Sequence, residues 1–379
     1  MMILLETQKS ATIVGIGAYI PDEIRTNDYW SADIIQQWNR SKNTKHKNFL
    51  HLKKQNQSDS VVDTHPLLEE ELKKLVGDPF VGMKERRVSH IPPSEMEVIA
   101  CKEALEDAQL KPEQIDLLMG FSLPPDRINP PNIYKVHHEL GLINAMCFEV
   151  SAICHSFLVM LDIAFQYIKN GTMKNILIFV STKYSSIMDY TSSVSTIAGD
   201  GAVAVVLSDC NIEKGLQILR HKFETDFYNT MLVRRRAPLR SPTPLFDFEE
   251  KQSNEKVFFT FNDIDKARTL MLKIPFWSEI IKKEFENHGY ITKKVDFMVT
   301  NAAMVWYSQV CAKIFEVSME NVEDNILKFS NMGAVNLPMN LYTAYKSNRL
   351  REGDSILMFG HGGGAGYGGA ILNWYKQKS

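Results

Sequence analysis

The sequence predicts an α/β protein made of two similar halves, each a βαβ-rich unit around a mostly parallel sheet. Two pairs of apolar segments support this prediction. IDLLMGFS at 115–122 and VDFMVTNA at 295–302 both begin with a hydrophobe followed by Asp, and ILIFVST at 176–182 matches ILMFGHG at 356–362 almost letter for letter. Members of each pair lie about 180 residues apart, as expected of a duplication.

A third match has a similar offset, because a glycine turn at Gly199 and another at Gly364 each precede a strand near the end of a half. We therefore divide the chain into an N-terminal half, 1–212, and a C-terminal half, 213–379. A Lys-, Asn- and Gln-rich stretch at about 35–77 is predicted to be a helical, largely solvated insertion.

The elements follow from apolar patterns taken in order. In the first half, continuous apolar runs predict buried strands, and a period of 3.6 residues predicts helices. We expect strands at 11–20, 115–122, 174–182 and 202–207, and helices at 94–108 (with Ser94 as N-cap), 132–140 and from 157 onward. In the second half we expect helices at 264–288, 306–315 and up to 348, and strands at 295–301, 355–360 and 370–375. From 215 to 256 the pattern is weak.

Composition narrows the functional classes. The chain has 379 residues, 44% of them hydrophobic, and carries 43 basic against 45 acidic residues, so we expect neither nucleic-acid binding nor membrane association. Five scattered cysteines without a CxxC spacing favour a reducing compartment, here the cytoplasm, over disulfides or a metal site.

One cysteine stands at a chemically useful place. In EVSAICHSF (149–157), an apolar run ends at Cys154 and a helical pattern follows. A helix N-terminus favours a thiolate, so Cys154 is a candidate nucleophile; the alternative is an ordinary buried cysteine. The adjacent His155 is interpreted as a packed or capping residue.

Six segments together resemble β-ketoacyl-acyl-carrier-protein synthase III, a member of the thiolase superfamily. They are VGIGAYIPDEIRTND (14–28), VGMKERRVS (81–89), FEVSAICHSF (148–157), AGDGAVAVVLS (198–208), SNMGAVNLP (330–338) and FGHGGGAGYGGAIL (359–372). The resemblance implies a thiolase-like fold of five α-β-α-β-α layers and a homodimer. It also implies an acyl thioester on Cys154, with Asn331 in the catalytic set and an oxyanion hole formed by the N–H groups of Cys154 and Gly363.

One departure concerns the catalytic histidine of the family, whose position is taken by Asn301 in VTNAAM. Asn301 can donate a hydrogen bond but cannot exchange a proton near neutral pH. Either the reaction differs or another group moves the proton. The candidate base is His361 in the glycine-rich segment, two residues from Gly363.

A second departure concerns the donor. The positions where relatives grip coenzyme A fall near Val76, Phe80 and Ser192, without a cation or an indole. A phosphate clamp needs fixed positive charge. The favoured donor is thus an acyl group on the phosphopantetheine arm of an acyl or peptidyl carrier protein, with coenzyme A less favoured and no other cofactor. The cations proposed to meet an acidic carrier protein are Lys84, Arg86 and Arg87, or Arg234 to Arg236; a merely solvated charged turn is the alternative.

The leading hypothesis is an acyltransferase that loads an acyl group on Cys154. It passes this group to a second substrate by C–C condensation or by ester or amide formation, in specialised fatty-acid-like or polyketide-like biosynthesis. The contrasting hypothesis is a non-catalytic, degenerate subunit that partners an active ketosynthase. The retained Cys154, Asn331 and glycine segment favour the enzyme.

Overall fold

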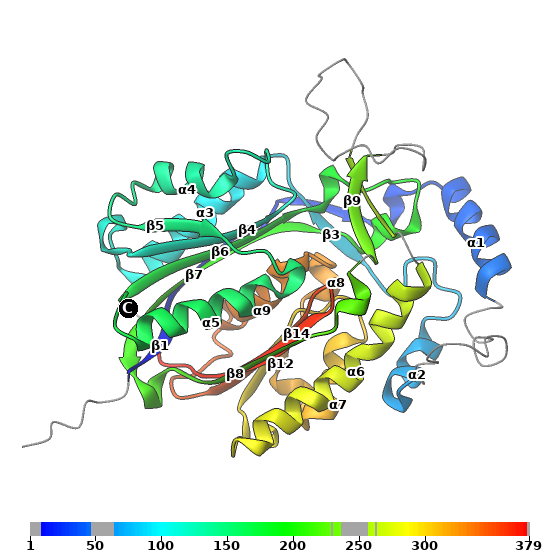
Figure 1. Ribbon diagram of the computed structural model, residues 1–379. Helices are drawn as coiled ribbons and strands as arrows, with labels where there is room; N and C mark the ends of the chain where they lie inside the picture. Colours follow the sequence, from blue (N-terminus) through cyan, green and yellow to red (C-terminus); the bar gives the residue numbers. More distant parts are fainter. Residues whose placement is uncertain (1–8, 47–63, 229, 236–256, 262–263, 377–379) are drawn as a thin grey trace, which may run out of the picture.

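The computed structural model describes residues 9–46, 64–228, 230–235, 257–261 and 264–376. Two five-stranded sheets alternate with three layers of helices, which gives the predicted α-β-α-β-α arrangement (Figure 1). None of the helices in the described ranges combines the length and the apolar character that a membrane-spanning segment needs.

The first sheet is built only from strands of the N-terminal half. Its order is β1 (Lys9–Tyr19), β7 (Asp200–Asn211), β6 (Asn175–Lys183), β4 (Leu117–Leu123) and β5 (Met146–Glu149). β4 runs parallel to β5 and β6, whereas β7 is antiparallel to both β6 and β1. Helices α3 (Pro93–Ala108) and α4 (Asn132–Leu140) cover its outer face, and α5 (Ser156–Lys169) lies on its inner face.

The second sheet repeats this design with strands that all follow residue 212. Its order is β8 (Leu216–Phe223), β14 (Gly366–Asn373), β13 (Ser355–His361), β11 (Phe297–Thr300) and β12 (Val322–Glu323). The strand directions match those of the first sheet, because β11 is parallel to β12 and β13 while β14 is antiparallel to β13 and β8. Helices α6 (Ile264–Asn287) and α7 (Tyr307–Phe315) lie outside, and α9 (Asn336–Lys346) lies beside α5 between the sheets (Figure 1).

The duplication is visible in single side chains. Asp116 precedes β4, and its carboxylate accepts hydrogen bonds from the N–H groups of Lys174 and Asn175 at the start of β6. Asp296 precedes β11, and its carboxylate accepts the N–H of Ser355 at the start of β13. The two repeated aspartates thus fix the register of the same strand pair in each half, which confirms the duplication inferred from the hydrophobe–Asp motif.

The remaining elements flank these layers. They are β2 (Glu23–Thr26), β3 (Glu85–Val88), β9 (Met231–Arg235), β10 (Val257–Phe261), α1 (Ala32–His46), α2 (Pro66–Lys74) and α8 (Ile326–Phe329). The predicted insertion contains most of α1 and all of α2, and its residues 47–63 lie outside the described residues. Ser94 is not an N-cap: Pro92 caps α3, and the Ser94 hydroxyl bonds to Asp126. The weak pattern at 215–256 concealed β8 and β9.

Candidate active site

A strained turn carries Cys154. The chain leaves β5 at Glu149, forms the short 3₁₀ helix η3 (Ile153–His155) and continues into α5. Ile153 has a φ of 55°, which is rare for a β-branched residue and is held only where the surroundings enforce it. The Ser156 hydroxyl supplies part of that enforcement, since it accepts the Ala152 N–H at 2.9 Å and donates to the Ile153 carbonyl at 2.7 Å.

The Cys154 thiol is half-buried and receives three groups that favour its anion. They are the Tyr184 hydroxyl and the backbone N–H groups of Gly363 and of Cys154 itself. Burial outweighs them, so the pKa of Cys154 lies above its ordinary value. The prediction that the helix start leaves a thiolate is therefore wrong for the resting protein. Another group must therefore take the proton of the Cys154 thiol when its sulfur attacks a substrate.

Tyr184 was missed by the sequence analysis because nothing in FVSTKYSS marks it as a site residue. It starts the 3₁₀ helix η4 (Tyr184–Ser186) directly after β6, and its side chain is buried. A Cβ on Gly333 would lie 2.8 Å from its hydroxyl oxygen, so this glycine leaves the room that Tyr184 occupies. Burial is the main cause that raises the pKa of Tyr184 well above its ordinary value, and the neighbouring Cys154 raises it further.

Replacement of Tyr184 by Phe is expected to slow alkylation of Cys154 by iodoacetamide at pH 8 roughly tenfold, because a hydrogen bond to a charged group contributes about 1.5–3 kcal/mol. The pH at which alkylation reaches half its maximum should rise. Tyr190→Phe, at a tyrosine that contacts Arg25 instead, is the matched control. An unchanged alkylation profile in Tyr184→Phe would remove this hydroxyl from the site.

The glycine segment lies directly on the nucleophile turn. A Cβ on Gly362 would lie 2.9 Å from the Ala152 carbonyl oxygen, and one on Gly364 would lie 3.4 Å from the Ile153 side chain. The loop closes on itself through a 2.7 Å bond from the Gly362 N–H to the Gly366 carbonyl. This close packing brings the N–H of Gly363 to the Cys154 sulfur, so the two predicted oxyanion donors lie together.

Asn331 is positioned by the N-terminal half. Its backbone N–H bonds to the Ile197 carbonyl at 2.8 Å, and its carbonyl accepts the Gly199 N–H at 3.0 Å. Its side-chain oxygen accepts the Gly333 N–H at 2.7 Å, and its amide nitrogen donates to the Ala303 carbonyl at 3.4 Å. Gly333 starts the 3₁₀ helix η10 (Gly333–Val335), which packs on η3, so Asn331 reaches the neighbourhood of Cys154 through this contact.

Asn301 follows β11 and is 1% exposed. Its amide group bonds to the main chain of His361, donating from Nδ2 to the carbonyl at 2.5 Å and accepting the N–H at 3.3 Å. The backbone N–H of Asn301 also reaches the Phe359 carbonyl at 3.2 Å. The asparagine at the histidine position of the family thus prolongs the β11–β13 pairing through its side chain and fixes the backbone of His361.

His361 ends β13 as a buried, neutral imidazole. Its Nδ1 lies 3.0 Å from the Tyr307 hydroxyl, and its ring stacks on Tyr307 with a centroid separation of 5.4 Å. Burial lowers the pKa of His361 to about 4. Burial raises the pKa of Tyr307 well above its ordinary value, and the charges of Cys311 and Cys154 raise it further. Tyr307 was also missed, since its place in an apolar helix start gives no signal.

Of the three positions expected to grip coenzyme A, Val76 is exposed, whereas Phe80 and the neighbourhood of Ser192 lie against the protein's own aromatic rings. Phe80 contacts Trp30 and Trp38, with centroid separations of 5.9 and 6.3 Å. The Trp38 indole donates to the carbonyl of Thr191, next to Ser192, at 2.7 Å. Both indoles are buried, so neither is available to stack on an adenine.

The predicted docking cations have different surroundings. Arg86 is 1% exposed and donates to Arg25, Asn27 and Thr196, so the prediction that it meets a carrier protein is wrong. Lys84 is exposed and Arg87 half-buried. Arg234 and Arg235 belong to β9, and Arg236 lies outside the described residues.

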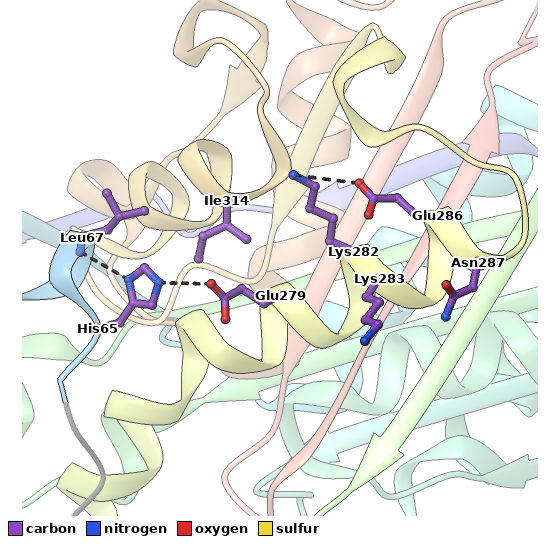
Figure 2. A pocket seen from close by; sticks show the side chains of 8 residues that line it. All are labelled: His65, Leu67, Glu279, Lys282, Lys283, Glu286, Asn287 and Ile314. Carbon is purple, nitrogen blue, oxygen red and sulfur yellow. Dashed lines mark hydrogen bonds and ion pairs between the residues drawn. The ribbon is translucent and has the colours of Figure 1, made fainter.

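An open groove of about 610 Å³ between α2, α6 and α7 shares no residue with this site (Figure 2). It is lined by His65, Leu67, Glu279, Lys282, Lys283, Glu286, Asn287 and Ile314. His65 is paired with Glu279 on α6, and Lys282 is paired with Glu286 one turn further along the same helix. The groove is therefore lined by residues other than those described at Cys154.

Comparison with known proteins places the chain in a family. The models described as 3-oxoacyl-[acyl-carrier-protein (ACP)] synthase III and its C-terminal part match residues 148–226 and 285–374. Beta-ketoacyl-[acyl-carrier-protein] synthase III of Campylobacter jejuni is 30% identical over 297 residues, which are 77% of this chain and 87% of that protein. The protein of the same name from Clostridium acetobutylicum is 26% identical over 371 residues, 97% of this chain and 99% of its own.

Among solved structures, the priming β-ketosynthase of a polyketide biosynthetic pathway superposes with a TM-score of 0.75 at 19% identity, covering 99% of both chains. That likeness concerns the thiolase-type fold, which the two repeated sheets also display. The matched ranges lie in both halves and contain the Cys154, Asn331 and glycine segments of this chain. The chain belongs to the β-ketoacyl-[acyl-carrier-protein] synthase III family of condensing enzymes.

Proposed function

We propose that this protein is an acyltransferase that carries its acyl group as a thioester on Cys154. The observation that supports this most is the convergence of the Gly363 and Cys154 N–H groups on the Cys154 sulfur. Such paired donors stabilise the oxyanion of a tetrahedral intermediate, and removing one typically costs 10²–10³ in rate. The sulfur attacks the donor carbonyl, the bond to the donor thiol breaks, and the thiol proton leaves with that donor.

His361 is proposed as the base that carries this proton. With its Nδ1–H donated to the Tyr307 hydroxyl, Nε2 has the lone pair that a base needs. Its low pKa keeps it neutral at pH 7. Asn301, whose amide is used on the His361 backbone, acts by positioning, and Asn331 is proposed to donate to the oxygen of the second substrate.

The proposed donor is an acyl group on the phosphopantetheine arm of an acyl or peptidyl carrier protein. The relatives are named for acyl-carrier-protein synthases, and the buried Trp30 and Trp38 take the space expected for a nucleotide grip. The second substrate is a carbon nucleophile of a malonyl or β-ketoacyl thioester, or an amine or hydroxyl. We further propose that the protein is a homodimer, as the resemblance implies.

The proposal is tested by measuring the intact mass of the protein after incubation with acyl-carrier-protein thioesters and, separately, with the same acyl groups on coenzyme A. We expect an acyl adduct that forms at least tenfold faster from the carrier protein. Equal rates would contradict the donor assignment only. Absence of an adduct with every donor would favour the non-catalytic subunit.

A further inference from the structure

A chain of three titratable side chains runs behind the nucleophile turn and has no part in the function proposed above. His155 is the residue after Cys154 and is 1% exposed. Its Nε2 lies 2.8 Å from Nδ1 of His221 on β8, with the two rings nearly perpendicular at 88°. Nε2 of His221 lies 3.6 Å from a carboxylate oxygen of Asp162 on α5.

The chain joins the two halves of the molecule. His155 and Asp162 come from the segment that carries Cys154, whereas His221 belongs to the second sheet. At the outer end, His221 is the largest cause that lowers the pKa of Asp162, although the 3.6 Å contact between them is longer than a hydrogen bond. Arg220, on the same strand as His221, lowers it further, and Gln166 donates to the other carboxylate oxygen at 3.2 Å.

The glycines of β14 are fitted to these rings. A Cβ on Gly368 would lie 2.9 Å from both His155 and His221, and one on Gly366 would lie 3.5 Å from His155. Gly362 of the loop beside Gly363 would meet the His155 Cβ at 3.4 Å. Some of these positions must therefore be glycine because the rings of His155 and His221 leave no room for a Cβ. The proposed oxyanion hole accounts for others.

The chemistry of the pair supports a fixed contact. A hydrogen bond between two imidazoles needs one ring with a free lone pair. Burial, together with His221 and His361, holds the pKa of His155 well below its usual range, so His155 is neutral at pH 7. A metal is not the explanation, since no three His, Cys, Asp or Glu side chains in the described ranges are grouped to hold one.

We propose that the Asp162–His221–His155 chain is a positioning device that holds the Cys154 turn against the Gly362–Gly366 loop and so keeps the Cys154 sulfur in line with the oxyanion donors. This inference rests on the proposed function for its kinetic consequence. The contact itself acts through structure: breaking the 2.8 Å bond frees the residue next to the nucleophile in a turn already strained at Ile153. A displacement of about 1 Å at a reacting centre can cost 10²-fold in rate.

The test compares His221→Leu, which removes the bond, with His221→Asn, whose amide places a polar atom near the former Nδ1. Lys222→Leu, on the same strand but paired with Glu284, is the matched control. We expect acylation of Cys154 to be at least tenfold slower in His221→Leu, and within threefold of wild type in His221→Asn. Alkylation by iodoacetamide, which needs no oxyanion hole, should slow less than acylation.

A second measurement does not depend on acylation. Amide hydrogen exchange in peptides covering 152–156 and 362–366 should accelerate at least tenfold in His221→Leu and not in Lys222→Leu. Unchanged exchange in both peptides overturns the positioning role, as does equal slowing of acylation in the Leu and Asn variants. Should wild type accept no acyl donor, the proposed function fails while hydrogen exchange still decides the role of the chain.

Discussion

Replacement of Cys154 by Ala is expected to abolish the acyl adduct and to lower turnover by at least about 10⁴-fold, because the covalent route is lost with the nucleophile. The oxyanion donors and the substrate contacts remain, but they have no intermediate to stabilise. The adduct is followed by intact mass and peptide mapping, and turnover by release of the free carrier thiol.

The other cysteines provide the controls. Cys147 on the neighbouring strand β5 is half-buried, and burial raises its pKa. Cys147→Ala should keep the adduct. Cys154→Ser should keep the fold and lose most of the rate, since a serine hydroxyl is far less acidic and a far weaker nucleophile than a thiol. An adduct that persists in Cys154→Ala would place the acyl group elsewhere.

The fold could be predicted from the sequence because its main signals are local and repeated. The aspartates before β4 and β11 accept corresponding backbone hydrogen bonds in the two halves. The strands that follow them are continuous apolar runs. A buried parallel strand needs no side-chain alternation, so such runs are readable without knowing the partners. β8 escaped notice because LQILRHKF mixes apolar residues with two cations and a histidine at the edge of its sheet.

The site was only partly predictable for a related reason. Cys154, Asn331 and the glycine segment belong to recognisable motifs. Tyr184 and His221, however, reach the nucleophile or its neighbour from positions set by tertiary packing. No spacing along the chain indicates these contacts, and missing β8 also concealed His221.

The electrostatic state of Cys154 shows the limit of local reasoning. Its place before a helix argues for a low pKa, yet desolvation is the larger effect and raises it. Similarly, an arginine in a charged turn suggests a docking surface, but Arg86 is buried against main-chain carbonyls and burial lowers its pKa to about 10. A motif does not show whether a side chain is buried. The predictions for the Cys154 pKa and for Arg86 both failed for this reason.

His361→Phe is expected to slow acylation of Cys154 by at least tenfold and by up to about 10⁴-fold, the range typical of general acid–base catalysis. Phe keeps the stacking on Tyr307 and the contact with Trp277 but removes both ring nitrogens. The wild-type rate needs the neutral imidazole, whose pKa is about 4, so it should stay constant from pH 8 to pH 5 and fall as the pH drops through 4. This acid limb should be absent in His361→Phe.

The control separates chemistry from packing. In His361→Phe the buried Tyr307 hydroxyl loses its partner, which costs about 1–3 kcal/mol of unfolding free energy. The double variant with Tyr307→Phe removes that orphaned group, so it should recover stability in denaturant titrations while remaining slow. If the double variant regains the wild-type rate, or if His361→Phe keeps both rate and acid limb, His361 is a packing residue and the proton from Cys154 takes another route.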